Sequence, residues 1–207
     1  MSIRRFWEAL KVEKSYLLFS VILFLSSCLY GVLFWDQVQQ VLKDAGIMEQ
    51  LLKITKKIAK EPTFTNIFST IFFNNLFVTI TAIISGVVFG IYPILIVVNN
   101  GMLLSAMVMG SASITKVHPL VLFVTTVLPH GIFELPAILI GAAFGIHLGM
   151  AVLRLFISFF TRKVENVVEE WRGIRNRFVV IVMGIAVFLL CAAIIETGLI
   201  LLMRSLQ

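Results

Sequence analysis

Residues 127–137 read Val-Leu-Pro-His-Gly-Ile-Phe-Glu-Leu-Pro-Ala and lie inside the most apolar part of the chain. Between residues 62 and 153 the only formally charged residues are Lys116 and Glu134. An apolar stretch of this length predicts helices in a lipid bilayer. An ionisable side chain at membrane depth is costly and marks a functional-site hypothesis by default. His130 and Glu134 are therefore the first candidates for a functional site.

The composition assigns the whole chain of 207 residues to the membrane. Hydrophobic residues make up 59% and charged residues 14%, with a mean hydropathy of +1.02, whereas about a quarter of a soluble domain is charged. We predict a single integral membrane domain over residues 1–207. Its fold class is all-α, a polytopic transmembrane bundle of about five spans with additional amphipathic interfacial helices. The predicted spans are residues 16–35, 76–98, 102–114, 120–153 and 178–203.

Basic residues set the expected orientation. One group precedes the first span, and a second occupies residues 154–177: Arg4, Arg5, Lys11, Lys14, Arg154, Arg162, Lys163, Arg172, Arg175 and Arg177. The positive-inside rule places residues 1–15 and 154–177 in the cytoplasm and residues 36–75 outside. The net charge of the chain is +6. Because the basic residues flank hydrophobic spans, we expect them to bind membrane lipids with anionic headgroups and not nucleic acid.

Residues 36–75 have the pattern of amphipathic helices. Before Pro62, apolar residues form a stripe along one predicted helix face, and the lysines lie outside this stripe. After Pro62, a second amphipathic segment that is richer in aromatic residues leads into Asn74 and Asn75. The stripe recurs at steps of three and four residues: Val38, Val41, Leu42, Ala45, Met48, Leu51, Leu52, Thr55 and Ile58. We expect both helices to lie in the interface or to cap the bundle. The alternative is a docking surface for an extracytoplasmic partner.

Residues 76–153 form the motif-bearing core. Gly86 and Gly90 lie four residues apart in the second predicted span, a spacing that allows close helix approach. Asn99, Asn100 and Gly101 predict a tight turn, because asparagine and glycine tolerate positive φ. A stripe of small residues follows at four-residue steps, Ala137, Gly141, Gly145 and Gly149. This stripe predicts close packing against a neighbouring span or against the same helix of a second copy in a homodimer.

The apolar stretch at residues 120–153 is too long for one ordinary span and too short for two with a loop. Pro129, Gly131 and Pro136 lie near its middle. Proline lacks a backbone donor, so we expect a broken or re-entrant helix there, with the freed carbonyls facing protein or water.

Three interpretations of His130 and Glu134 remain open. They could form a structural hydrogen-bonded pair, a pair that handles a proton or a substrate, or two ligands of a metal ion. No other cofactor is expected. The amides of Asn74, Asn75, Asn99 and Asn100 are the natural partners of the pair, although each asparagine pair could simply cap a span. Glu196 in the last span could reach the interface or face inward toward His130 or His147.

The sequence carries no glycine-rich phosphate loop, HExxH, GxSxG or suitably spaced pair of catalytic carboxylates. An enzyme would have only His130 and Glu134 for its chemistry. We therefore expect a protein that is not an enzyme.

Residues 67–76 (IFSTIFFNNL), the Asn-Asn-Gly at 99–101, the Pro-His-Gly-x-x-Glu-Leu-Pro-Ala element and the glycine stripe together resemble the stage II sporulation protein M family. The resemblance covers about residues 64–154 closely and the whole chain in layout. It implies a multi-pass protein of the bacterial cell membrane. The functional residues that it implies are Asn74, Asn75, Asn100, Gly101, Pro129, His130, Gly131, Glu134 and Pro136.

The founding type of this family is needed for engulfment of the forespore, where it looks like the membrane anchor of two peptidoglycan-degrading partner proteins. The resemblance thus implies a non-enzymatic scaffold of a peptidoglycan-remodelling complex. Some members resemble permease subunits of ATP-driven exporters, so the first alternative is a transport subunit with its site at His130 and Glu134. The second alternative is an intramembrane metal-dependent protein.

Overall fold

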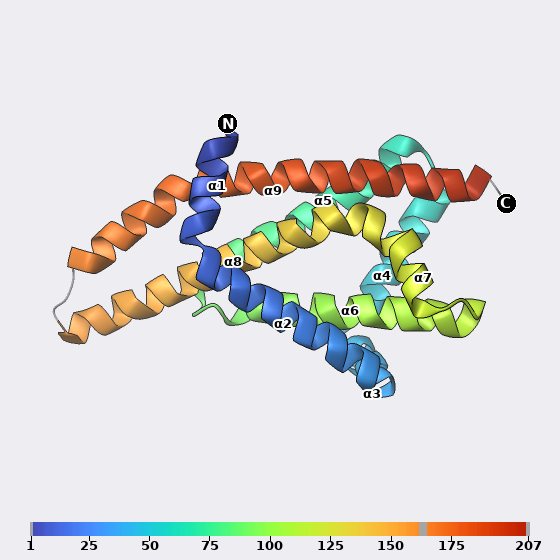
Figure 1. Ribbon diagram of the computed structural model, residues 1–207, viewed down its shortest axis with the longest axis horizontal. Helices are drawn as coiled ribbons and strands as arrows, with labels where there is room; N and C mark the ends of the chain where they lie inside the picture. The colour runs from blue at the N-terminus through green and yellow to red at the C-terminus, as the bar shows by residue number, and fades with distance from the viewer. Residues whose placement is uncertain (1, 162–164, 206–207) are drawn as a thin grey trace.

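The computed structural model describes residues 2–161 and 165–205, and within these ranges its secondary structure is helical, with no strand (Figure 1). The predicted all-α fold is confirmed. The α-helices are α1 (Ile3–Val12), α2 (Lys14–Leu33), α3 (Trp35–Asp44), α4 (Ile47–Lys60), α5 (Phe64–Ile84), α6 (Ile91–Thr115), α7 (Pro119–Leu122), α8 (Leu128–Thr161) and α9 (Glu165–Ser205).

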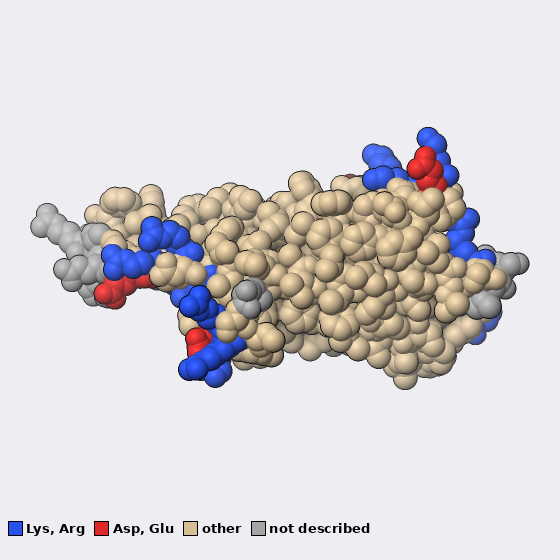
Figure 2. All heavy atoms as spheres, turned by 90° about the horizontal axis from the view of Figure 1, so that it is seen from above, with Lys and Arg blue, Asp and Glu red and all other residues tan. Residues whose placement is uncertain are grey.

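Five helical segments are long and apolar enough to cross a membrane, as predicted. They are Lys14–Leu33, Phe64–Val87, Ile91–Thr115, Pro119–Phe160 and Val167–Ser205. Figure 2 shows the same organisation from the charges: on the face drawn, the basic and acidic residues gather at the two ends of the long axis and leave an uncharged band between them. Arg162 and Lys163 of the predicted basic segment lie outside the described residues.

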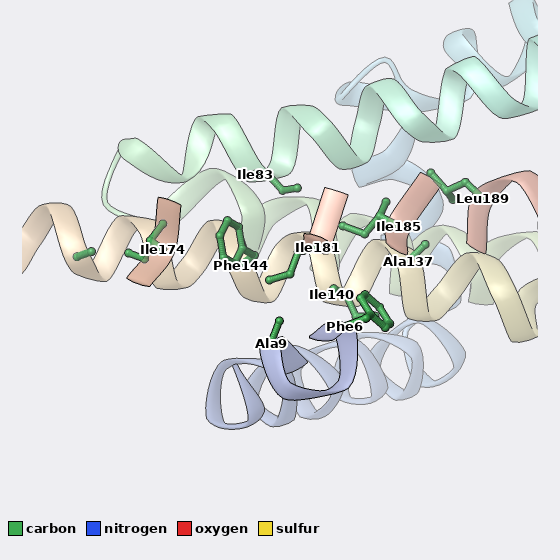
Figure 3. Packing of buried hydrophobic residues seen from close by; sticks show 11 residues of the cluster. Phe6, Ala9, Ile83, Ala137, Ile140, Phe144, Ile174, Ile181, Ile185 and Leu189 are labelled. Atoms are coloured by element: carbon green, nitrogen blue, oxygen red, sulfur yellow. The ribbon is translucent and has the colours of Figure 1, made fainter. Parts of the chain in front are cut away.

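Helix α8 is the centre of the bundle. In the most apolar window of each span, 67% of the residues are buried for the α8 segment but only 22–33% for the other four, so the other spans surround α8 and face the lipid. Phe144 of α8 packs in one core cluster with Ile181 and Ile185 of α9 (Figure 3). The amphipathic α1 joins this cluster, because its Phe6 ring lies against Gly184.

The hairpin between the second and third spans is not where the sequence predicts it. Helix α5 already begins at Phe64, so Asn74 and Asn75 lie inside it and the predicted segment 36–75 ends within a span. The chain turns through a 3-10 helix at Ser85–Val87 and two residues with positive φ, Phe89 (52°) and Gly90 (72°). The predicted span 76–98 is therefore wrong.

The predicted turn at Asn99-Asn100-Gly101 is also wrong, because these residues lie within α6. Asn100 Nδ2 donates to the Ile96 carbonyl at 2.8 Å, a bond that follows the helix. A Cβ on Gly101 would come within 2.8 Å of the Phe24 carbonyl of α2. The glycine therefore serves a close contact between α2 and α6, and the predicted span 102–114 is the second half of a longer helix.

The long apolar segment is a continuous helix and not a re-entrant one. Its irregularity lies before Pro129, in a π-helix at Phe123–Val127 where the Leu128 N–H donates to the Phe123 carbonyl. A π turn at this point accommodates Pro129, which has no backbone N–H to donate to the preceding turn. The hydroxyls of Thr125 and Thr126 donate to the carbonyls of Val121 and Leu122 at 2.8 and 2.6 Å, which satisfies backbone groups in the widened turn.

The small-residue stripe of α8 packs within the chain. Cβ atoms on Gly141, Gly145 and Gly149 would strike Thr79, the Ala82 carbonyl and the backbone of Gly90, respectively. A Cβ on Gly86 would strike the carbonyl of Gly145. Of the two predicted partners, the neighbouring span is the correct one, and Gly86 and Gly90 contribute from the α5–α6 turn.

The predicted amphipathic helix outside the first span is split in two. Gly46, with a φ of 71°, separates α3 from α4. Val38 and Leu42 of α3 are fully buried and pack with Ala106 of α6. Within the described α4, in contrast, no residue is buried. Helix α3 is therefore the anchor and α4 the exposed element.

Candidate functional site

His130, Glu134 and Glu196 form the polar cluster within the apolar band. Because α8 is continuous after Leu128, His130 and Glu134 lie one turn apart on the same face. Glu196 of α9 meets them there, and the metal-ligating atoms of the three side chains all lie within 4.8 Å of one another. Of the orientations predicted for Glu196, the one toward His130 is therefore correct.

The cluster lies in a largely apolar contact between α8 and α9. Phe133, which precedes Glu134 in the sequence, packs its ring against that of Phe188 of α9, with the two ring centroids 6.2 Å apart. All three side chains are partly buried, and His130 Nδ1 is buried with no hydrogen-bond partner in the described structure. Two carboxyl groups and an imidazole in this position can share a proton or hold a cation.

The predicted asparagine partners do not reach this cluster. Asn74 Nδ2 donates to Asn75 Oδ1 at 3.2 Å, so these two amides bond each other within α5. The Asn100 amide bonds the backbone of its own helix. The ionisable group that does meet His130 and Glu134 is Glu196 of α9.

The prolines and the glycine of the motif belong to the helix itself. Pro129 is the second residue of α8, and Pro136 lies inside it. Gly131 is buried, and a Cβ added to it would have its nearest neighbour, the side chain of Val127, at an ordinary 3.6 Å. No close backbone contact thus depends on Gly131, and these residues shape the helix that carries His130 and Glu134.

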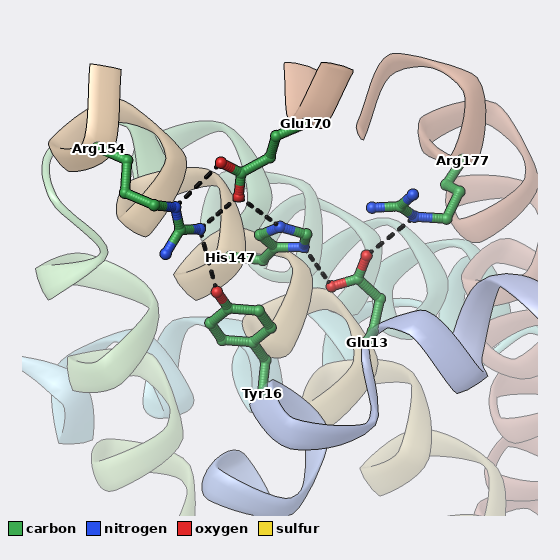
Figure 4. Close-up of polar contacts among 6 residues, drawn as sticks. All are labelled: Glu13, Tyr16, His147, Arg154, Glu170 and Arg177. Atoms are coloured by element: carbon green, nitrogen blue, oxygen red, sulfur yellow. Dashed lines mark hydrogen bonds and ion pairs between the residues drawn. The ribbon is translucent and has the colours of Figure 1, made fainter. Parts of the chain in front are cut away.

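A second polar cluster, which the sequence did not predict, joins the α1–α2 junction to α8 and α9 around His147 (Figure 4). His147 Nδ1 lies 2.6 Å from Glu13 Oε2, and His147 Nε2 lies 3.2 Å from Glu170 Oε1. Glu13, between α1 and α2, is only 2% exposed. The ring of Tyr16 stacks on the imidazole with a centroid distance of 4.6 Å.

Two arginines complete the His147 cluster. Arg154 binds Glu170 through Nε at 3.0 Å and through Nη2, and it also donates to the Tyr16 hydroxyl at 3.2 Å. Arg177 Nε donates to Glu13 Oε1 at 3.1 Å. Each carboxylate therefore lies against one arginine and one nitrogen of His147.

The two clusters differ in what they can do. They lie on the same helix about 25 Å apart, given 17 residues at 1.5 Å each. The His147 cluster is satisfied by its arginines and by Tyr16, so it ties α1, α2, α8 and α9 together. The His130 cluster has no such partners among the described residues and is the better candidate for binding.

Comparison with known proteins gives a family and one relative. The family described as Stage II sporulation protein M matches residues 20–199. An uncharacterized protein of Methanocaldococcus jannaschii is 32% identical over 103 residues, which are 50% of this chain and 55% of that protein. The match thus spans about half the length of this curated relative. No solved structure matches the chain significantly.

Proposed function

The chain belongs to the stage II sporulation protein M family, and we propose that it is a non-enzymatic membrane scaffold of a peptidoglycan-remodelling complex that acts in forespore engulfment. Its partners in this proposal are peptidoglycan-degrading proteins outside the membrane. The family match supports a sporulation-related, multi-pass membrane protein, and the scaffold role is the finer step that we propose.

The observation that carries the scaffold proposal is the α3–α4 pair. Helix α3 is fixed to α6 by Val38 and Leu42, whereas α4 offers exposed Met48 and Leu52 at 40% and 57% exposure. Exposed apolar residues on a helix that follows an anchored one support docking of a partner protein or contact with the membrane surface. A scaffold needs such a surface and needs no catalytic residues.

The orientation is part of the proposal. The basic residues of α1 and of residues 154–177 favour a cytoplasmic location for both segments. In this orientation α3 and α4, which follow the first span, would lie on the opposite, extracytoplasmic side. That side is where peptidoglycan lies, so α4 would face the proposed partners.

The test uses the full chain in a sporulating host that lacks its own copy. The parent chain should restore engulfment and co-purify with peptidoglycan hydrolases. Replacing Met48 and Leu52 by serine should leave the membrane level unchanged but reduce both the recovered hydrolases and engulfment. Lys56→Ser, an exposed change on the same helix, is the matched control. Normal engulfment in the deletion strain would contradict the proposal.

A transport subunit is the second candidate, and the His130 cluster is the observation that favours it. Transporters commonly place their sites near the bilayer midplane between helices. This candidate predicts an ATPase that co-purifies with the chain and ATP-dependent transport that is lost in Glu134→Ala. An ATPase-free complex with hydrolases would favour the scaffold.

A further inference from the structure

His130, Glu134 and Glu196 form a compact set of ligand groups contributed by two helices. The first two lie on α8 at positions i and i+4, and the third comes from α9, 62 residues after Glu134 in the chain. Their ligand-capable atoms lie within 4.8 Å of one another. Around a tetrahedral ion with bond lengths near 2.1 Å, ligand atoms are about 3.4 Å apart. Small side-chain rotations would therefore bring the three groups onto one ion.

The charges of this cluster are not balanced by the protein. Within residues 2–161 and 165–205, no lysine or arginine forms an ion pair with Glu134 or Glu196, and neither carboxyl group forms a hydrogen bond. His130 Nδ1 is likewise buried without a partner. Two neighbouring carboxylates in an apolar environment repel each other and lack solvation. They require protons or a bound cation.

The types of ligand distinguish between cations. Magnesium and calcium prefer sites made of oxygen atoms, whereas zinc and its neighbours in the first transition row accept imidazole together with carboxylates. Three protein ligands also leave one coordination position for water or another ligand. The set therefore suits a divalent transition-metal ion.

We propose that His130, Glu134 and Glu196 bind one divalent transition-metal ion, with Zn²⁺ as its representative, between α8 and α9. The ion would neutralise both carboxylates and connect the π-helix end of α8 to the C-terminal half of α9. This inference does not depend on the scaffold function. It would hold equally for a transport subunit.

The experiment measures metal binding by the full-length chain in mild detergent, purified with an affinity tag that contains no histidine. After chelation, Zn²⁺ alone is titrated, and metal content is measured by elemental analysis. Co²⁺ is then used as a spectroscopic probe, because its visible absorption reports low-symmetry coordination. We expect one Zn²⁺ per chain and a rise in thermal stability with added Zn²⁺.

Glu134→Gln and Glu196→Gln are the test variants. Both remove a charge from an apolar site and should therefore fold. Each should weaken Zn²⁺ binding by at least the roughly 10–100-fold that is typical of changes around a metal site, and each should remove the Co²⁺ absorption. Glu61→Gln and His118→Asn, which change an exposed carboxylate and an exposed imidazole, are the matched controls and should bind like the parent.

Two results would overturn the proposal. The first is a parent chain that takes up no stoichiometric Zn²⁺ or Co²⁺, which would leave shared protons to neutralise the carboxylates. The second is binding that persists unchanged in both glutamine variants while their elution profiles and melting curves match the parent, because the metal would then lie elsewhere. If one variant fails to fold, the other decides.

Discussion

At the residue scale, two histidines on the same helix have opposite surroundings. His147 has a carboxylate at each ring nitrogen, and each of these carboxylates also binds an arginine. His130 lies beside two carboxyl groups, and no described cation pairs with them. A satisfied buried network specifies how helices pack, whereas an unsatisfied one retains capacity for a ligand. We therefore expect ligand binding at His130 and not at His147.

The first prediction concerns Glu134. Glu134→Ala should abolish complementation while the amount of protein in the membrane stays near the parent level, because removing a carboxyl group eases transfer into lipid. Glu134→Gln should retain part of the function if Glu134 is only a hydrogen-bonding strut, and none if it carries a proton or binds a metal. Engulfment and membrane content are measured together, with Glu61→Ala as the control. Full function of Glu134→Ala would show that this site is incidental.

The second prediction concerns His147. His147→Gln should lower the free energy of unfolding by about 3 kcal/mol, because it leaves the buried Glu13 carboxylate and the partly buried Glu170 carboxylate without their shared partner. Denaturant unfolding in detergent measures the loss. In a double-mutant cycle with Glu13→Gln, the two losses should not add, since both changes break the same contact. Additive losses would mean that Glu13 and His147 act independently, and His118→Asn provides the exposed-histidine control.

At the element scale, the glycine stripe gives the third prediction. Gly145→Leu should destabilise the bundle by about 3 kcal/mol or more, since even a Cβ would strike the Ala82 carbonyl. Gly145→Ala should show the same effect to a smaller extent. The stripe packs inside the chain, so the loss should appear in the unfolding curve and not as a change in oligomeric state. Gly198→Ala, with nothing within 4 Å of the new methyl group, should be neutral or slightly stabilising.

The same glycines explain which elements could be predicted from the sequence. Hydropathy identifies five spans, and the four-residue spacing identifies the contact surface of α8, because both signals are local. Gly101 and Gly90 cannot be told apart in this way. Gly101 lies in a helix to admit the Phe24 carbonyl, whereas Gly90 adopts a φ of 72° in the actual turn. Which role a glycine has depends on distant neighbours, and so the sequence predicts the hairpin in the wrong place.

The candidate site shows the same limit. His130 and Glu134 are four residues apart, and their proximity follows from helix geometry. Glu196 joins them from another helix, so its inward orientation is only one of the alternatives that the sequence allows. Glu13 and His147 are separated by 134 residues, and no local pattern links them. Only the packing of α8 against α9 and of the α1–α2 junction against both brings these groups together.

At the scale of the whole molecule, the charges define two ends and a band between them (Figure 2). The His147 cluster lies near the basic residues of one end, since Arg154 and Arg177 belong to it. The opposite end carries the lysines of α3 and α4 and Lys116. Both ends carry basic residues, so the positive-inside rule favours an orientation by the difference between the two ends.

The last prediction is the outcome of cysteine labelling in intact cells. Cys28 and Cys191 are first replaced by alanine, and single cysteines are then introduced at exposed Lys53 of α4, Glu8 of α1 and Arg175 of α9. A membrane-impermeant maleimide should label Lys53→Cys directly. It should label Glu8→Cys and Arg175→Cys only after permeabilisation, because five spans place α4 opposite both of them. The reverse pattern would place α4 in the cytoplasm, away from peptidoglycan, and would remove the structural basis for docking hydrolases there.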